Sequence, residues 1–556
     1  MKKLFPLLGL SIFFAINFVQ AQQPGCFSRL DSIMPLAYNI HLDSRDIEVD
    51  SKDNYYITGG RMSDTMFYNG NIIVAEGLIY LTKFNKNHHL IWNITNTTND
   101  AGFGETIAID HKNNVIVGGY YSQSLTFGKD TLSSQNGSFN NAFISKFKPD
   151  GIHLWSKRVH TPGLFSDGRI TSLSTDGLGN IYFGGIFGGS MIFGQDSIQT
   201  WGYGDNYWGK MDSTGNIQWI KAAGSEAIEI GVNVAADSIG NLYVLGSVNN
   251  SYDSTYIDNF LNFNGIGFIA KYSPSGQMKW LKGAEKGEFS MGIRSTDGKI
   301  QTRNGVVIAS GPMFDYSDSN IVSIAGAQTN IDSNSRKPAF VLKMDTAGNG
   351  IWLKEAIRTY YDVDVMGVAI KSNGDIALTT HNGYYVEEDS LSGLTYRSPV
   401  YLTLDGNSGQ VLNYCYPKQP GNGTYLSRSI TLLNDTILAT GSFDRQINGH
   451  RRIFIAKVGL NTVGIENYDL APQSIVLYPN PTNNGRFTLD ISNTEGVEFN
   501  QLTIFNVNGQ LMHSKKLERK TNYNKIELQL NNFSKGIYFL SLQHSKGRIT
   551  KKLIVQ

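Results

Sequence analysis

The stretch STDGLGNIYFGG, residues 174–185, joins a tight Asp/Gly/Asn turn to an apolar run that ends on two glycines. Close versions of it occur as DSKDNYYITGG at 50–60, DHKNNVIVGG at 110–119 and DSIGNLYVLG at 237–246. Gly with Asp or Asn between alternating apolar runs is typical of a β-hairpin. Each copy therefore predicts the same turn and the same strand, repeated along the chain.

A second phrase follows each copy at a regular distance: an aromatic residue, two residues, Lys, eight residues and Trp. It occurs with Tyr80, Lys83 and Trp92; Phe143, Lys146 and Trp155; Tyr207, Lys210 and Trp219; Phe268, Lys271 and Trp280; Phe340, Lys343 and Trp352. Two weaker copies have Tyr401 with Leu404 in place of Lys, and Phe454 with Lys457 and no Trp. A small residue is expected in the strand after each turn, at Gly59, Gly119, Gly185, Gly246, Ser310, Thr380 and Thr440.

These units contain about four alternating strands each and no helical periodicity. Their length of about 60 residues is small for β-sandwich domains of about 100. Radial closure of four-stranded sheets protects the sheet edges, which favours a β-propeller. The units resemble the SBBP-type seven-bladed β-propeller repeats of bacterial surface proteins over about residues 41–460. We therefore expect an all-β chain with a seven-bladed β-propeller over residues 22–460.

The N-terminus has the pattern of a secretory signal peptide over residues 1–21. Two lysines precede a mostly apolar run at 4–19, and small residues lead to cleavage after Ala21. The run is short for a membrane span, and no other apolar segment approaches spanning length, so we expect no transmembrane segment in the mature chain.

The charge balance changes sign near residue 470. Residues 22–471 hold 35 Lys and Arg against 42 Asp and Glu, whereas 472–556 hold 11 against 5. The change predicts a domain boundary, with a linker at 461–473. Because the acidic body has no basic run, we expect no nucleic-acid partner.

Residues 474–556 alternate apolar and polar positions between Asn/Gly turns, which predicts a small immunoglobulin-like β-sandwich. The segment resembles the type A C-terminal sorting domain of the type IX secretion system of Bacteroidota. The matching residues are Tyr478, Pro479, Asn480, Pro481, Gly485, Asn508, Gly509, Gly536, Tyr538, Lys551, Lys552 and Leu553. The resemblance implies that the type IX secretion machinery is a partner, that this domain is removed after export, and that the body is released or attached to the outer surface.

The chain has two cysteines, Cys26 and Cys415, which in an exported protein can pair or stay free. The last unit lacks its outer strand, and the N-terminal segment 27–40 is unassigned. We predict that this segment supplies the missing strand and joins the two ends of the propeller. That closure would bring Cys26 near Cys415 and allow a disulfide.

The sequence contains no familiar catalytic, metal or cofactor motif such as His-Glu-x-x-His, Cys-x-x-Cys or Gly-x-Ser-x-Gly. We therefore assign no catalytic residue, no metal and no cofactor. The repeated lysines have two explanations, a ring around a channel that holds an anion or a structural role such as pairing with the turn Asp. A residue that recurs once per unit favours the structural role.

Aromatic residues that break the repeat are the candidate ligand contacts. They are Trp201, Tyr203, Tyr384 and Tyr385, and the alternative for them is packing between blades. We expect a secreted or surface-displayed propeller that binds a glycan or protein without catalysis. The alternatives are a propeller enzyme, such as a polysaccharide lyase or glycoside hydrolase using Glu226, Glu229, Asp362 or Asp364, and a structural adhesin component.

Overall fold

The structure is a computed structural model of the 556-residue chain. It describes residues 26–35, 42–61, 65–68, 71–74, 77–97, 101–134, 140–159, 168–193, 196–227, 229, 231–248, 255–258, 260–261, 267–283, 298–312, 321–330, 339–357, 364–381, 399–417, 423–445, 450–459, 476–482, 485–491, 499–506, 511–517, 525–530, 533–544 and 547–556. Every regular element in these residues is a β-strand. The described chain divides into two compact units, one within Gly25–Glu466 and one within Asn467–Gln556.

The first unit consists of antiparallel sheets that follow one another along the chain, and each is called a blade after its first strand. The β2 blade pairs β2 (Leu42–Val49), β3 (Tyr55–Arg61), β6 (Ile79–Phe84) and β7 (Leu90–Thr95). The β8 blade pairs β8 (Gly102–Ile109), β9 (Val115–Tyr121), β12 (Asn141–Phe147) and β13 (His153–Val159). The β14 blade pairs β14 (Gly168–Thr175), β15 (Ile181–Phe187), β18 (Asp205–Met211) and β19 (Ile217–Ser225).

The later blades repeat this order. The β20 blade has β20 (Val232–Ala236), β21 (Leu242–Ser247), β24 (Gly267–Tyr272) and β25 (Met278–Gly283). The β26 blade has β26 (Lys299–Arg303), β27 (Val306–Pro312), β30 (Ala339–Asp345) and β31 (Gly350–Ile357). The β32 blade has β32 (Asp364–Ile370), β33 (Ile376–His381), β34 (Tyr401–Leu404) and β35 (Val411–Cys415). The β36 blade has β36 (Gly423–Leu433), β37 (Thr436–Arg445), β38 (His450–Val458) and β1 (Phe27–Pro35).

Shorter strands complete this unit. Three pairs stand as separate hairpins: β10 (Ser124–Phe127) with β11 (Asp130–Ser133), β16 (Ser190–Phe193) with β17 (Asp196–Gln199), and β28 (Ile321–Ile324) with β29 (Ala327–Asn330). Two pairs extend a blade: β22 (Thr255–Ile257) and β23 (Phe260–Leu261) beyond β19, and β4 (Thr65–Tyr68) and β5 (Asn71–Val74) beyond β1.

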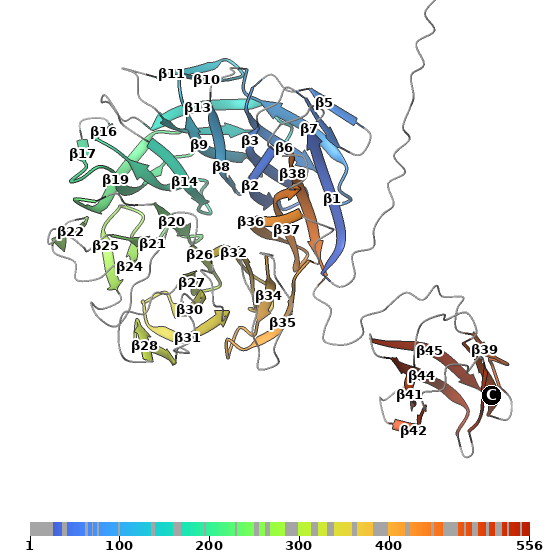
Figure 1. The fold of residues 1–556 in the computed structure, drawn as a ribbon. Helices are drawn as coiled ribbons and strands as arrows, with labels where there is room; N and C mark the ends of the chain where they lie inside the picture. Colours follow the sequence, from blue (N-terminus) through green and yellow to red (C-terminus); the bar gives the residue numbers. More distant parts are fainter. Residues whose placement is uncertain are drawn as a thin grey trace, which may run out of the picture. The chain divides into compact units, whose positions relative to one another are not determined.

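The first strands of the blades form a closed ring. Each contacts the first strand of the next blade, from β2 to β8 and onward to β36, and β36 contacts β2. Figure 1 shows the blades arranged around a centre with these strands innermost. Antiparallel sheets repeated radially around an axis define a β-propeller, so the all-β propeller class expected from the sequence is confirmed.

The apolar cores lie between adjacent blades. One buried cluster joins Tyr56 and Ile79 of the β2 blade to Ile107, Val117 and Phe143 of the β8 blade. Each blade therefore buries apolar side chains against its neighbours, which is why a single unit of this size needs the next one to be stable.

The repeated turn phrase folds through its aspartate. Oδ1 of Asp50 accepts the N–H groups of Lys52 and Asn54, each at 2.9 Å, and Oδ2 accepts the Tyr56 hydroxyl at 2.9 Å. The same backbone contacts recur at Asp110, Asp176 and Asp237. This side-chain turn satisfies backbone donors locally, so the phrase specifies its own hairpin.

The glycines after the turn are required by close backbone approach. A Cβ on Gly119 would lie 1.9 Å from the carbonyl oxygen of Phe103, and one on Gly185 would lie 1.9 Å from that of Arg169. Both sit opposite a β-bulge in the first strand of their blade. Only glycine leaves room for that carbonyl.

Four positions of the predicted repeat are wrong by one residue. Gly311 and Gly441 pair with the repeated aromatics, rather than Ser310 and Thr440. The β26–β27 and β36–β37 hairpins close with two-residue turns, so counting from a longer turn misplaces the strand. In the β32 blade, Leu404 pairs with Ile376 as Phe84 pairs with Tyr55. Leu404 therefore lies one residue beyond the lysine position, and Tyr401 lies one residue beyond the aromatic position.

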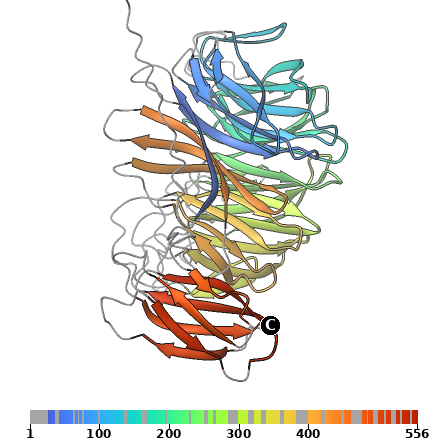
Figure 2. The ribbon, with the colours of Figure 1, turned by 90° about the vertical axis from the view of Figure 1, so that its right-hand side faces the viewer.

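The N-terminal strand completes the last blade. β1 pairs antiparallel with β38, from Phe27 opposite Val458 to Ile33 opposite Ile453. Figure 2 shows this dark blue strand lying against the orange strands of the β36 blade. The expected joining of the two ends of the propeller is confirmed for residues 27–33, whereas Met34 and Pro35 pair with β4. Residues 36–40 of the predicted segment lie outside the described residues.

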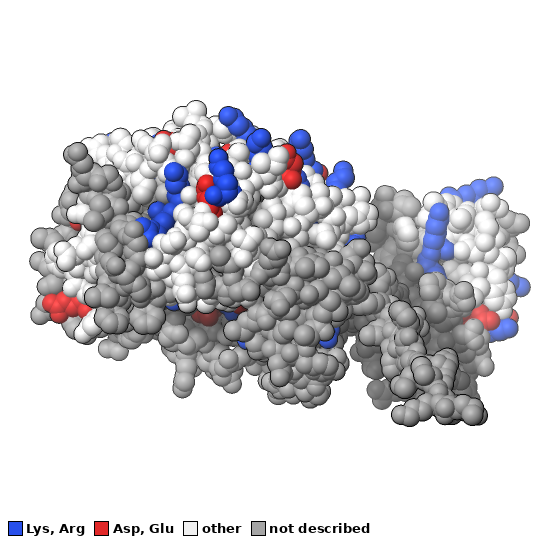
Figure 3. Space-filling model, turned by 90° about the horizontal axis from the view of Figure 1, so that it is seen from above, with Lys and Arg blue, Asp and Glu red and all other residues white. Residues whose placement is uncertain are grey.

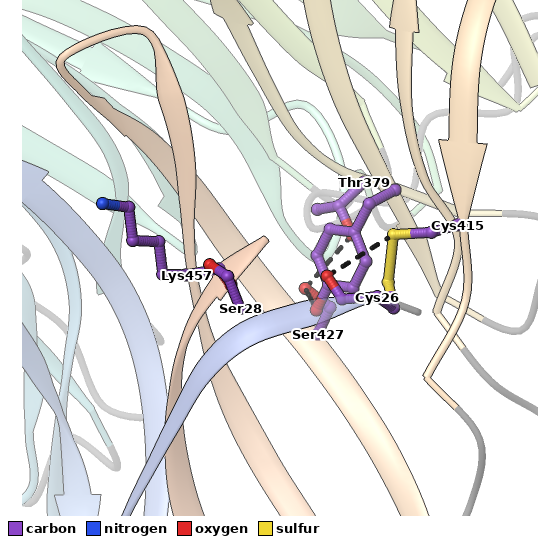
Figure 4. The surroundings of a disulfide bond; sticks show 7 residues. Cys26, Ser28, Thr379, Cys415, Ser427 and Lys457 are labelled. Carbon is purple, nitrogen blue, oxygen red and sulfur yellow. Dashed lines mark hydrogen bonds between the residues drawn. A yellow bond between two sulfur atoms is a disulfide. The ribbon is translucent and has the colours of Figure 1, made fainter. Parts of the chain in front are cut away.

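A disulfide joins Cys26, just before β1, to Cys415 at the end of β35 in the neighbouring β32 blade. Their Cα atoms are 5.2 Å apart. Figure 4 shows the bond beside Ser427 and Thr379, whose hydroxyl groups are hydrogen-bonded at 3.2 Å. The bond thus links two blades at the point where the ring closes.

The second unit contains two sheets around one core. One sheet pairs β39 (Val476–Tyr478), β40 (Arg486–Asp490) and β43 (Lys525–Gln529). The other pairs β42 (Leu511–Lys516), β41 (Phe499–Asn506), β44 (Gly536–His544) and β45 (Gly547–Val555). Phe487 and Leu489 from the first sheet share a buried cluster with Ile504 and Leu540 from the second. The described residues include no helix long and apolar enough to span a bilayer.

Candidate functional site

Five of the repeated lysines hold neighbouring blades together. Each donates a hydrogen bond to a carbonyl in the outer hairpin turn of the next blade: Lys83 to Pro149 at 2.7 Å, Lys146 to Ser213 at 3.2 Å, Lys210 to Pro274 at 3.2 Å, Lys271 to Thr346 at 2.8 Å and Lys343 to Gly406 at 2.6 Å. Two also pair with the turn aspartate of their own blade, Lys83 with Asp50 at 3.9 Å and Lys146 with Asp110 at 2.9 Å. The structural explanation of these lysines is the one that the contacts support.

Four of the repeated tryptophans bond at the same contact between blades. Trp92 lies opposite Lys83 on the neighbouring strand, and its indole N–H donates to the same Pro149 carbonyl at 3.2 Å. Trp219, Trp280 and Trp352 reach the same carbonyl as the lysine of their own blade. The fixed Lys-x8-Trp spacing therefore places two donors on one acceptor across a hairpin.

The off-repeat aromatics Trp201 and Tyr203 lie in the loop before β18. Tyr203 is 85% exposed and Trp201 is 48% exposed. The Trp201 ring packs on Tyr256 of β22, with ring centroids 4.6 Å apart and planes inclined by 31°. We call Trp201, Tyr203 and Tyr256 the aromatic platform. Tyr384 and Tyr385 lie outside the described residues.

The carboxyl group of Asp205, the first residue of β18, anchors this platform. It is fully buried, and its Oδ2 accepts the backbone N–H of Trp201 at 2.9 Å and the hydroxyl of Tyr256 at 2.6 Å. Burial raises the pKa of the Asp205 carboxyl to about 6, and the two hydrogen bonds partly offset that rise. One buried group thus sets the position of both the Trp201 backbone and the ring beneath its indole.

Two of the acids proposed for an enzymatic alternative, Glu229 and Asp364, lie in different parts of the propeller. Glu229 is buried near the platform loop, where it accepts the Ser225 hydroxyl at 2.6 Å and its N–H donates to Gly204 at 2.8 Å. Asp364 starts β32 in a different blade, and Asp362 lies outside the described residues. Among the described residues, no group of three His, Cys, Asp or Glu side chains could hold a metal ion.

Sequence reasoning missed a cluster of charged side chains on the innermost strands. Arg45 and Asp43 on β2, Glu105 on β8 and Arg428 on β36 form three contacts: Arg45 to Asp43 at 3.3 Å, Arg45 to Glu105 at 3.8 Å and Arg428 to Asp43 at 3.7 Å. No repeat marks these residues, because they differ from blade to blade.

On the described surface visible in Figure 3, Lys and Arg stand apart from one another rather than forming a continuous basic patch.

Several residues of the predicted sorting motif tie the start of the second unit to its last strand. The Asn480 side chain donates to the Lys552 carbonyl at 2.7 Å and accepts the Ile554 N–H at 2.9 Å. Gly485 has a positive φ of 70°, and a Cβ there would lie 2.6 Å from the Leu530 carbonyl oxygen. Tyr538 is buried and donates to Ser534 at 2.8 Å.

The other motif residues are placed as follows. Tyr478 ends β39, and Pro479 and Pro481 follow cis peptide bonds. Gly536 starts β44, while Lys551, Lys552 and Leu553 lie on β45. Asn508 and Gly509, like the predicted cleavage site at Ala21, lie outside the described residues.

The fold defines an all-β protein with a propeller unit and a separate two-sheet unit. Residues 476–556 match the family model of the secretion system C-terminal sorting domain. This domain indicates export by the type IX secretion system to the cell surface or the medium, as the sequence predicts.

Comparisons of the whole chain give distant likenesses. An uncharacterized WD repeat-containing protein of Acanthamoeba polyphaga mimivirus is 28% identical over 144 residues, which are 24% of this chain and 10% of that protein. The chain thus spans about a tenth of the length of this curated relative. A solved protein of unknown function from Bacteroides caccae has 11% identity and a TM-score of 0.32, covering 66% of this chain and 95% of its own. The WD40 domain of SCAP from fission yeast has 8% identity and a TM-score of 0.30, covering 78% of this chain and 98% of its own.

Proposed function

We propose that this protein is an exported propeller that binds a glycan or a protein without catalysing a reaction. The aromatic platform carries the proposal: Trp201 and Tyr203 depart from the repeat, and both rings are exposed. Exposed aromatic faces stack on the C–H groups of sugars and anchor protein partners.

The fixed position of the platform supports a binding role. The backbone of Trp201 and the hydroxyl of Tyr256 both bond to the buried Asp205 carboxyl. An aromatic ring held in place before binding loses little conformational freedom when a ligand arrives. A ring needed only to fill space between blades would be buried, as Trp208 is.

A glycan array and a pull-down with surface proteins, run in parallel with a polysaccharide-degradation assay, test this function. We expect a bound ligand, no turnover, and at least tenfold weaker binding by Trp201→Ala and Tyr203→Ala. Ile239→Ala is the matched control, because Ile239 is a 76% exposed apolar residue in a repeated turn. Turnover of a polysaccharide, or equal binding by the platform variants, would refute the proposal.

We further infer the finer organisation from the sequence pattern. The body is proposed to be a seven-bladed propeller of the SBBP type over residues 22–460, preceded by a signal peptide at 1–21 and followed by a linker at 461–473. The segment 474–556 is proposed to be an immunoglobulin-like sorting domain of a protein from Bacteroidota, recognised by the type IX machinery through the motif residues named above.

Truncation tests the sorting assignment separately from ligand binding. Without residues 474–556, we expect a folded propeller that stays in the periplasm. The same residues fused to a periplasmic reporter should carry it to the surface or medium in a host with the type IX machinery. Immunoblots of cell fractions measure where each protein accumulates. A truncated protein that reaches the surface at normal levels would overturn the sorting role of residues 474–556.

A further inference from the structure

Three charged side chains on the innermost strands, those of Arg45, Glu105 and Arg428, occupy the same structural position, a bulge in the first strand of their blade. β2, β8, β14, β32 and β36 each contain an irregularity that leaves one residue out of the pairing ladder. The residues at that position are Arg45, Glu105, Thr171, Met366 and Arg428. A bulge re-aims the side chain of its extra residue and is common next to functional sites.

Charge at this bulge position is confined to adjacent blades. β36 contacts β2, and β2 contacts β8, so Arg428, Arg45 and Glu105 are consecutive around the ring. The corresponding residues of β14 and β32 are neutral, although those bulges have the same register irregularity. The backbone therefore does not require charge here, and these three side chains need another explanation.

One N–H donor on each of the two guanidinium groups has no hydrogen-bond partner in the described part of the chain. Within the described residues, the Nε atoms of Arg45 and Arg428 and the Oδ1 atom of Asp43 are buried without a hydrogen-bond partner. Their ion pairs, at 3.3 to 3.8 Å, exceed the usual N–H···O distance of about 2.9 Å. Each guanidinium offers five N–H groups in a fork that suits a planar or tetrahedral oxyanion.

Charged groups of both signs surround Arg428. Arg451 of β38 acts with Arg45 as a like charge on Arg428, while Asp43 and Glu105 are the acids that face the group. Burial, followed by these like charges, lowers the pKa of Arg428 below its usual range.

Aromatic side chains of the β8 blade pack against arginines of the two neighbouring blades. The Arg45 guanidinium lies over Phe103 of β8 at 5.1 Å, and the Arg169 guanidinium of β14 lies over Tyr120 at 4.6 Å. The ring centroids of Phe103 and Tyr120 are 5.8 Å apart. All of these side chains except Asp43 are partly exposed, so solvent reaches the cluster.

We propose that Arg45 and Arg428 form a second binding site, which takes a carboxylate or sulfate group of a ligand. The incoming oxyanion accepts hydrogen bonds from both guanidinium groups and displaces the long contacts to Asp43. The site is separate from the aromatic platform in the β14 blade, so it does not depend on the function proposed for that platform.

Calorimetric titration of the purified full chain tests the proposal with glucuronate, glucose 6-sulfate and uncharged glucose. We expect one or both charged sugars to bind and glucose to bind at least tenfold more weakly. Binding of glucuronate alone identifies a carboxylate ligand, and binding of glucose 6-sulfate alone identifies a sulfate ligand; both support the site. No binding by either charged sugar, or equal binding of glucose, overturns it.

Variants separate this role from a structural one. Arg428→Gln should weaken charged-sugar binding at least tenfold, and Arg29→Gln, which removes an exposed arginine from β1, should leave it unchanged. Asp43→Asn removes the competing carboxylate and should strengthen binding severalfold, which also guards against loss of fold in Arg428→Gln. Unchanged binding by Arg428→Gln, or weaker binding by a folded Asp43→Asn chain, would show that the arginines serve the fold alone.

Discussion

Replacing Cys26 with Ser should weaken the closure of the propeller. The disulfide joins residues separated by 389 positions, and it links β1 to the β32 blade. Because β1 comes from the N-terminal end of the propeller unit and pairs with β38 at its C-terminal end, its attachment holds the two ends of the ring together. The backbone pairing of β1 with β38 remains in the variant, so the ring should still close, but against a larger entropy of the unfolded chain.

The size of the effect follows from the loop that the disulfide closes. A loop of 389 residues lowers the entropy of the unfolded chain by an amount worth about 6 kcal/mol at 25 °C in the chain-entropy model. Structure retained in the unfolded chain reduces this figure, so we expect a loss of about 3–6 kcal/mol in the free energy of unfolding.

Guanidinium unfolding, followed by tryptophan fluorescence, measures this loss in the free energy of unfolding. All 7 tryptophans lie between residues 92 and 352, so the signal reports on the propeller unit alone. Cys415→Ser and the double variant should match Cys26→Ser, since each removes the same bond. Ser28→Ala, which removes an exposed hydroxyl bonded to Lys457, is the control and should change stability by less than about 0.5 kcal/mol. Equal unfolding midpoints for the Cys26→Ser and unaltered chains would refute the reasoning.

Three further predictions concern joints between and within blades. Lys146→Met should destabilise the propeller by about 3–5 kcal/mol in the same assay, because it strands the buried Asp110; Lys210→Met, which breaks no ion pair among the described residues, should cost far less. Gly185→Val should lower the melting temperature by several degrees, since its Cβ would lie 1.9 Å from the Arg169 carbonyl; a melting temperature within a degree of the unaltered chain would contradict this. The raised pKa of Asp205, about 6, means that its protonated form stabilises the fold: this contribution, about 3 kcal/mol, is complete below the unfolded value near pH 4 and is lost as the pH rises through 6. Urea unfolding from pH 4 to pH 8 should show a fall in stability with rising pH that is larger for the unaltered chain than for Asp205→Asn. Parallel pH profiles of the two chains would exclude this contribution of Asp205.

The repeat itself could be read from the sequence because its chemistry is local. The turn aspartate bonds to residues two and four positions away, and the Lys83–Trp92 spacing spans one hairpin. The conformation of a hairpin depends on residues close together in sequence, so the sequence of each unit specifies its own hairpins. Trp201 and Tyr203 could be selected as candidates for a related reason, since they depart from a pattern whose other members are needed for packing, but their exposure is visible only in the structure.

The partners of these residues could not be read from the sequence, because they depend on contacts between distant segments. Lys83 bonds to a carbonyl 66 positions away in the next blade, and carbonyls carry no sequence signal. The anchoring of Trp201 depends on Tyr256 reaching Asp205 across 51 positions.

The sequence by itself determined the period of the units, their hairpins and the export domain, because these features rest on short-range patterns. Only the tertiary structure decided which residues meet at the centre. Arg45 and Arg428 are 383 residues apart in number, yet they approach the same Asp43 because β36 lies beside β2 when the ring closes. A one-residue bulge sets where each of these side chains points, and strand register is fixed by packing across the whole sheet rather than by the residue that bulges.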